Sequence, residues 1–201
     1  MKIAMAAVVM LGFSFVSGGT GPLAQEPPKA VVDELVERHK PRLQGLTAEA
    51  IERVWREQVQ SEPWFRKLHA QWAAQKDDPD IVQTLRDDPS CAEVDPSNQD
   101  TTFQGQAKQY RCMGDIRERD YSGQMVVYVN VNGSGLLASA VMLARIPLPF
   151  PFGGIGPDEQ AALLELYSDM TTRMDNARAP PGSHVEYSKD LEYLKFAAQF
   201  R

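Results

Sequence analysis

The sequence predicts an α+β fold: an N-terminal helical region, a three-stranded antiparallel meander and C-terminal helices follow one another along the chain. Apolar residues recur at helical spacing over residues 28–88, they alternate around a hairpin signal over 103–146, and helical spacing returns over 157–200. Helices and strands are therefore segregated rather than interleaved, which is the pattern of an α+β protein. We expect residues 25–201 to form one domain.

The first 24 residues have the features of a signal peptide. Lys2 supplies a positive start, residues 3–16 are an uncharged run, and the small residues Ser17 and Gly19 follow it. Crossing a bilayer takes roughly 20 apolar residues, so this run is short for a transmembrane helix. We expect it to be removed on export, which predicts a periplasmic or secreted protein without stable membrane insertion. An uncleaved anchor is the alternative.

Two cysteines, Cys91 and Cys112, are the only ones in the chain. An even pair in an exported protein most simply forms one disulfide. In the chain-entropy model a bridge that closes a loop of this length stabilises the fold by about 3 kcal/mol. We predict this bridge, with two separate buried thiols as the alternative.

Residues 28–88 are expected to form four helices. Pro41 ends the first, and Thr47 is a good N-cap for the second. The third carries Trp64, Phe65, Leu68 and Trp72 on one side, and the fourth begins near Asp78. Aromatic residues at this spacing are expected to lie in the core rather than around a ligand.

The strand signals begin after a polar loop at residues 89–102. We expect strands over 106–119, 124–131 and 136–146, joined by turns at 121–123 and at Asn132-Gly133-Ser134-Gly135. Asn and Gly tolerate the positive φ angles of tight hairpin turns. The third strand is apolar at both parities, which predicts that both of its faces are covered.

The C-terminal part is expected to contain a helix over 157–178 and a second helix that starts after Ser188 and carries Leu191, Leu194 and Phe200. In the first of these helices Leu163, Tyr167, Met170 and Met174 share one side. The spacing of these residues favours an amphipathic helix packed on the core.

Composition argues against nucleic-acid binding. The chain carries 27 acidic and 21 basic residues, a net charge of −6, and no basic stripe is visible. Binding to a phosphate backbone requires clustered Lys and Arg, so we expect no nucleic-acid partner.

No catalytic or metal-binding motif is apparent. His39, His69 and His184 lack the spacing of metal ligands. The acidic segment at residues 77–80 lacks the ligand pattern of a calcium loop, and helix capping explains it better. We expect no cofactor and no metal.

The segment from Leu148 to Ile155 is the strongest candidate for a binding surface. Leu148, Phe150, Phe152 and Ile155 lie on a backbone whose prolines and glycines exclude regular structure. Extended Pro-rich segments are pre-organised for binding partners. The equally weighted alternative is that the two phenylalanines fold back and cap the sheet.

These observations favour a non-enzymatic envelope or secreted binding module that acts through protein-protein contact. Two alternatives stay open: a small extracytoplasmic hydrolase whose site is assembled from distant residues, and a binder of small ligands. A paired histidine and carboxylate in a polar pocket would favour the hydrolase.

The prediction on export is tested by the intact mass of the protein recovered from the envelope or the medium. We expect a mass that lacks the N-terminal segment, because the apolar run is too short to span a bilayer and small residues follow it. A mass that includes Met1 would refute cleavage.

Overall fold

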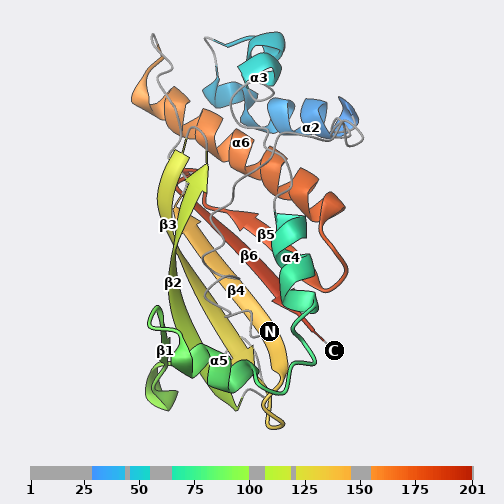
Figure 1. The fold of residues 1–201 in the computed structure, drawn as a ribbon. Coiled ribbons are helices and arrows are strands. Elements are labelled where there is room, and N and C mark those ends of the chain that lie inside the picture. Colours follow the sequence, from blue (N-terminus) through green and yellow to red (C-terminus); the bar gives the residue numbers. More distant parts are fainter. Residues whose placement is uncertain are drawn as a thin grey trace.

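A computed structural model describes residues 29–43, 46–54, 65–99, 107–118, 121–145 and 155–200. In these ranges one antiparallel sheet is packed with α-helices (Figure 1). The fold is therefore α+β, as predicted. Among the described helices, none combines the length and the apolar composition that crossing a membrane requires.

The sheet has six strands in the order β1-β2-β3-β4-β6-β5, and each neighbouring pair is antiparallel. The strands are β1 (Cys91–Glu93), β2 (Lys108–Glu118), β3 (Tyr121–Val131), β4 (Leu137–Arg145), β5 (Ser183–Tyr187) and β6 (Tyr193–Gln199). The predicted three-stranded meander is wrong as a description of the sheet. It forms the middle of the sheet as β2, β3 and β4, and three further strands extend it.

The predicted last helix is also wrong, because residues 193–199 form β6. Leu194, Phe196 and Ala198 are buried and alternate with more exposed residues, which is the period of a strand. Leu191, Leu194 and Phe200 fit a helical period equally well, so spacing alone did not separate the two structures. Pairing with β4 on one side and β5 on the other satisfies the backbone of β6 and decides for the strand.

Of the two predicted turns, one is confirmed and one is misplaced. Gly135 N donates to Asn132 O at 3.0 Å, and Gly135 has a φ of 80°, which favours glycine. Residues 121–123, predicted as a turn, instead belong to β3. Tyr121 pairs with Glu118, so β2 and β3 are longer than the turn residues suggested.

The helices are α2 (Lys29–His39), α3 (Ala48–Val54), α4 (Phe65–Ala73), α5 (Ile81–Asp87) and α6 (Pro157–Arg178). The predicted N-cap is confirmed, since the Thr47 hydroxyl accepts from the amide of Ala50 at 3.2 Å. The predicted bounds of α6 are confirmed too. In the acidic segment 77–80, predicted to cap a helix, the Asp80 side chain makes no cap hydrogen bond, whereas the Asp78 carboxylate accepts from the amide of Asp80 at 2.9 Å.

The buried residues form two clusters. In the first, α4 and α5 cover one face of the sheet, and the rings of Phe65 and Trp72 each lie 5.5 Å from that of Phe196. In the second, α6 packs against α2 and α3, with Leu35, Ile51 and Tyr167 among its buried residues. Figure 1 shows α4 and α5 in front of the sheet, while α6 crosses its upper end beneath α2 and α3. Phe65 and Trp72 are core residues, as predicted.

Side chains of α6 bind the outer edge of β5. The Ser168 hydroxyl donates to Tyr187 O at 3.1 Å, and Tyr187 N donates to the Thr172 hydroxyl at 3.2 Å. Val185 N donates to Asn176 Oδ1 at 2.9 Å, and Asn176 Nδ2 donates to Val185 O at 2.6 Å. Residues four apart share one face of a helix, so the three polar side chains act in place of a seventh strand.

We predict that Asn176→Ala destabilises the protein. The change removes both partners of Val185, and each buried backbone group left without a hydrogen bond costs about 1–3 kcal/mol. Allowing for entry of water, urea unfolding should show a loss of about 2–4 kcal/mol.

Arg173→Ala is the matched control, because Arg173 is exposed on the same helix and its surface ion pair with Glu34, at 3.5 Å, contributes at most about 1 kcal/mol. An Asn176→Ala protein no less stable than the Arg173→Ala protein would contradict this account of the β5 edge.

Candidate functional site

The face of the sheet opposite α4 and α5 is the candidate site, and we call it the helix-free face. Alternate residues of a strand point to opposite faces, so the neighbours of each residue in the first cluster point to this one. No helix of the described part of the chain packs on it. Five strands contribute side chains in paired rows, in the spatial order β2, β3, β4, β6 and β5.

The centre of the helix-free face is apolar and partly exposed. Among the described residues, Leu143 on β4 and Tyr193 on β6 are the large hydrophobic side chains that are exposed, with 38% and 50% of their surface accessible. Half-buried Met113 and Val126 lie in the same row as Leu143. Exposed apolar side chains that adjoin one another, rather than lying scattered, are typical of contact surfaces.

A row of buried polar side chains lies on the same face, two rows away from Leu143. Gln109 Nε2 donates to Asn130 Oδ1 at 2.8 Å, and Asn130 Nδ2 donates to Ser139 Oγ at 2.9 Å. All three residues are buried, and Gln109 Oε1 has no hydrogen-bond partner among the described residues. The network links β2, β3 and β4, which fixes their register because a slip of one residue would break both bonds.

The predicted binding segment lies mostly outside the described residues. This holds for Leu148, Phe150 and Phe152. Ile155 is described, and it is half-buried against the second cluster beside α6. The C-terminal end of the segment is thus attached to the helical layer.

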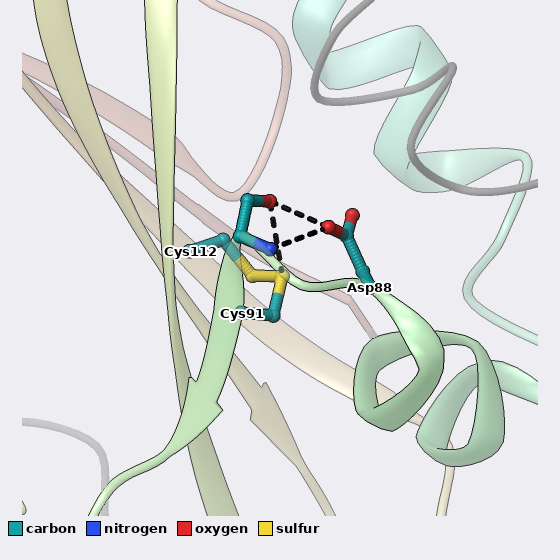
Figure 2. The surroundings of a disulfide bond; sticks show 4 residues. Asp88, Cys91 and Cys112 are labelled. Atoms are coloured by element: carbon teal, nitrogen blue, oxygen red, sulfur yellow. Dashed lines mark hydrogen bonds between the residues drawn. A yellow bond between two sulfur atoms is a disulfide. The ribbon is translucent and has the colours of Figure 1, made fainter.

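The predicted disulfide is confirmed: Cys91 and Cys112 are bonded across the β1–β2 pair (Figure 2). Figure 2 also shows Asp88 beside the bridge, where its Oδ1 accepts from the amide and hydroxyl of Ser90 at 2.9 and 2.7 Å. Asp88 is buried, and within the described part of the chain its Oδ2 has no hydrogen-bond partner. These bonds shape the turn from α5 into β1.

The three histidines lie in different parts of the fold. His39 Nε2 lies 3.5 Å from Asp169 Oδ2, which joins α2 to α6. The His69 ring lies 5.5 Å from the Phe200 ring, and partial burial lowers the pKa of His69. His184 is exposed on the helix-free face. In the described residues, no group of three His, Cys, Asp or Glu side chains could hold a metal ion.

One buried acid and tyrosine pair has an altered titration. Tyr187 OH donates to Asp175 Oδ2 at 2.7 Å where α6 meets β5. Burial raises the pKa of Asp175 from 3.8 to about 6, although the hydrogen bond from Tyr187 and the charge of Arg178 act in the opposite direction. A carboxyl group with this pKa can exchange protons near neutrality, but only 4% of Asp175 is accessible. We therefore interpret the pair as part of the α6–β5 contact.

Sequence reasoning missed the helix-free face. The apolar run over 136–146 predicted a strand covered on both faces, whereas Leu143 is exposed on this one. Tyr193 was assigned to a helix. The available signal was the alternation of Leu143 and Arg145 with buried Met142 and Ala144, which is that of a strand with one face toward solvent.

No known family model, curated protein sequence or solved structure matches the chain. Arguments about function therefore rest on the residues of the chain itself.

The raised pKa of Asp175 predicts a pH-dependent contribution to stability. The folded state holds this proton more tightly than the unfolded chain, so the contribution is full below about pH 4 and is lost as the pH rises to about 6. A difference of about two pK units corresponds to at most about 3 kcal/mol. Asp175→Asn removes the charge while its Oδ1 can still accept from Tyr187. The variant should therefore gain stability relative to wild type across this window.

The measurement is urea unfolding of both proteins from pH 4 to pH 7.5, and the quantity of interest is the difference between the two curves. A difference that does not change with pH would show that Asp175 titrates alike in the folded and unfolded states.

Proposed function

We propose that this chain is an exported, non-enzymatic binding module whose helix-free face makes protein-protein contact. The observation that carries the proposal is the position of Leu143 and Tyr193. Both are exposed, and they lie on neighbouring strands, with Tyr193 directly opposite Arg145 and therefore diagonal to Leu143. On one sheet face such diagonal neighbours are about 7–8 Å apart, so the two side chains form one patch.

The chemistry of the patch fits a protein surface. Protein-protein contacts have an apolar and aromatic centre within a polar rim. Here Leu143, Val126 and Tyr193 supply the centre. The rim includes Arg111, Gln124 and Glu186, all of them exposed.

Export is supported by two features. The N-terminal segment has the composition of a signal peptide, and the disulfide between Cys91 and Cys112 is of a kind that persists in oxidising compartments. Segment 148–155 is a second candidate contact, attached to the body of the protein through Ile155.

Site-specific photo-crosslinking in the producing cells tests the proposal. A photoreactive side chain in place of Leu143 or Tyr193 should yield protein adducts of discrete mass, because these positions face the partner. Ala74 is the matched control, since it is exposed beside the end of α4 and hence away from the helix-free face.

Adding unlabelled wild-type chain should reduce the adducts by competition, whereas chain carrying Leu143→Glu should compete at least tenfold less well, a loss of about 1.4 kcal/mol of binding free energy. Equal labelling at Leu143, Tyr193 and Ala74, or the absence of discrete adducts, would exclude the helix-free face as a contact surface.

A further inference from the structure

The helix-free face has a centre on β4, the third of its five strands. In one row Met113, Val126, Leu143, Lys195 and Glu186 lie side by side across β2, β3, β4, β6 and β5. The exposed Leu143 is therefore the middle residue of its row, with two strands on each side. A two-fold axis placed along β4 would bring the Leu143 side chains of two copies together.

Charges of opposite sign stand at the two margins of this face. Arg111 on β2 and Glu186 on β5 are both exposed, and neither makes an ion pair or side-chain hydrogen bond with another described residue. The strand order puts them four strand spacings apart, about 19 Å, which is too far for an ion pair within one chain. A face with an unpaired positive charge at one margin and an unpaired negative charge at the opposite margin is complementary in charge to a second copy of itself that is turned by 180°.

We propose that the partner of the helix-free face is a second copy of this chain, packed face to face about a two-fold axis along β4. The inference rests on the proposed function and names its partner. The axis places the β2 margin of each copy over the β5 margin of the other, so each Arg111 meets a Glu186. Arg111 lies one row from the row of Glu186, a step of about 7 Å that an arginine side chain spans.

The remaining charges near the centre are compatible with this packing. Lys195 lies directly opposite Glu186 on the neighbouring strand but forms no ion pair with it, so its stem can cover apolar surface while its ammonium group stays in solvent. The same axis brings the two Arg145 side chains together, and the Glu192 carboxylate 3.9 Å from each guanidinium offsets this contact between like charges. Aligned sheets pack about 10 Å apart in this way, with side chains of both faces interdigitating.

The area of the helix-free face determines how tightly two copies are expected to bind. Five strands and three rows of side chains extend roughly 19 Å by 14 Å, less than the roughly 800 Å² per partner of a standard interface. The dimer should therefore be weak, with a dissociation constant in the micromolar range or above, and concentration should control it.

Sedimentation of the full exported chain from about 10 µM to about 1 mM tests the inference over the range expected of a small interface. We expect a reversible monomer-dimer equilibrium. Leu143→Glu should weaken it at least tenfold, whereas Ala74→Glu, which adds the same charge on the other side of the sheet, should leave it unchanged. Thermal unfolding establishes that each variant is folded.

A charge exchange gives the sharper test. Arg111→Glu and Glu186→Arg should each weaken the dimer several-fold, and the double variant should restore it, because the two charges then meet with signs reversed. A wild-type chain that stays monomeric, or a double variant weaker than either single one, would overturn the inference. If the photo-crosslinks at Leu143 then join a different protein, the binding function stands and only its assigned partner is wrong.

Discussion

The outer edge of β5 is the constraint on which the arrangement of layers depends. An edge strand presents unpaired amide and carbonyl groups, and these must be satisfied where water is excluded. Ser168, Thr172 and Asn176 satisfy those of Val185 and Tyr187. A helix can do this only when its polar residues recur every four positions and its apolar residues face away from the edge. α6 meets both conditions, and it therefore joins the sheet to the second cluster.

The opposite edge of the sheet, at β1, is stabilised by a disulfide rather than by helix side chains. β1 has only three residues, and its pairing with β2 is reinforced by the disulfide between Cys91 and Cys112. A short strand gains little from its own hydrogen bonds, so the covalent bond stabilises a pairing that three residues alone would hold weakly. Asp88 and Ser90 direct the chain from α5 into this strand. A helix thus covers one edge, and a short bridged strand lies along part of the other.

How much the sequence could predict depends on the range of the interactions that decide each element. The Asn132 turn, the Thr47 cap and the bounds of α6 depend on neighbouring residues, and their prediction was right. The last strand was missed because Leu191, Leu194 and Phe200 fit a helix, whereas Phe196 and Ala198 fit a strand, and only pairing with β4 decides between them. The spacing of Ser168, Thr172 and Asn176 at every fourth position of α6 can likewise be read from the sequence. Their role as hydrogen-bond partners of β5 cannot, because it depends on how the later strand packs against the helix.

The candidate site was missed for a related reason. A residue's exposure depends on which face of the sheet the helices cover, and this is a property of packing rather than of local sequence. β4 is apolar at both parities except at Ser139 and Arg145, so only these two residues, which share the parity of Leu143, indicated that Leu143 is exposed while Met142 is buried in the cluster that contains α4. The positions of the helices, however, determine which face of β4 is buried and which is exposed. With α4 and α5 on one face and α6 along the β5 edge, the helix-free face is the surface of the described residues on which exposed apolar side chains adjoin one another, and Arg111 and Glu186 stand at its margins.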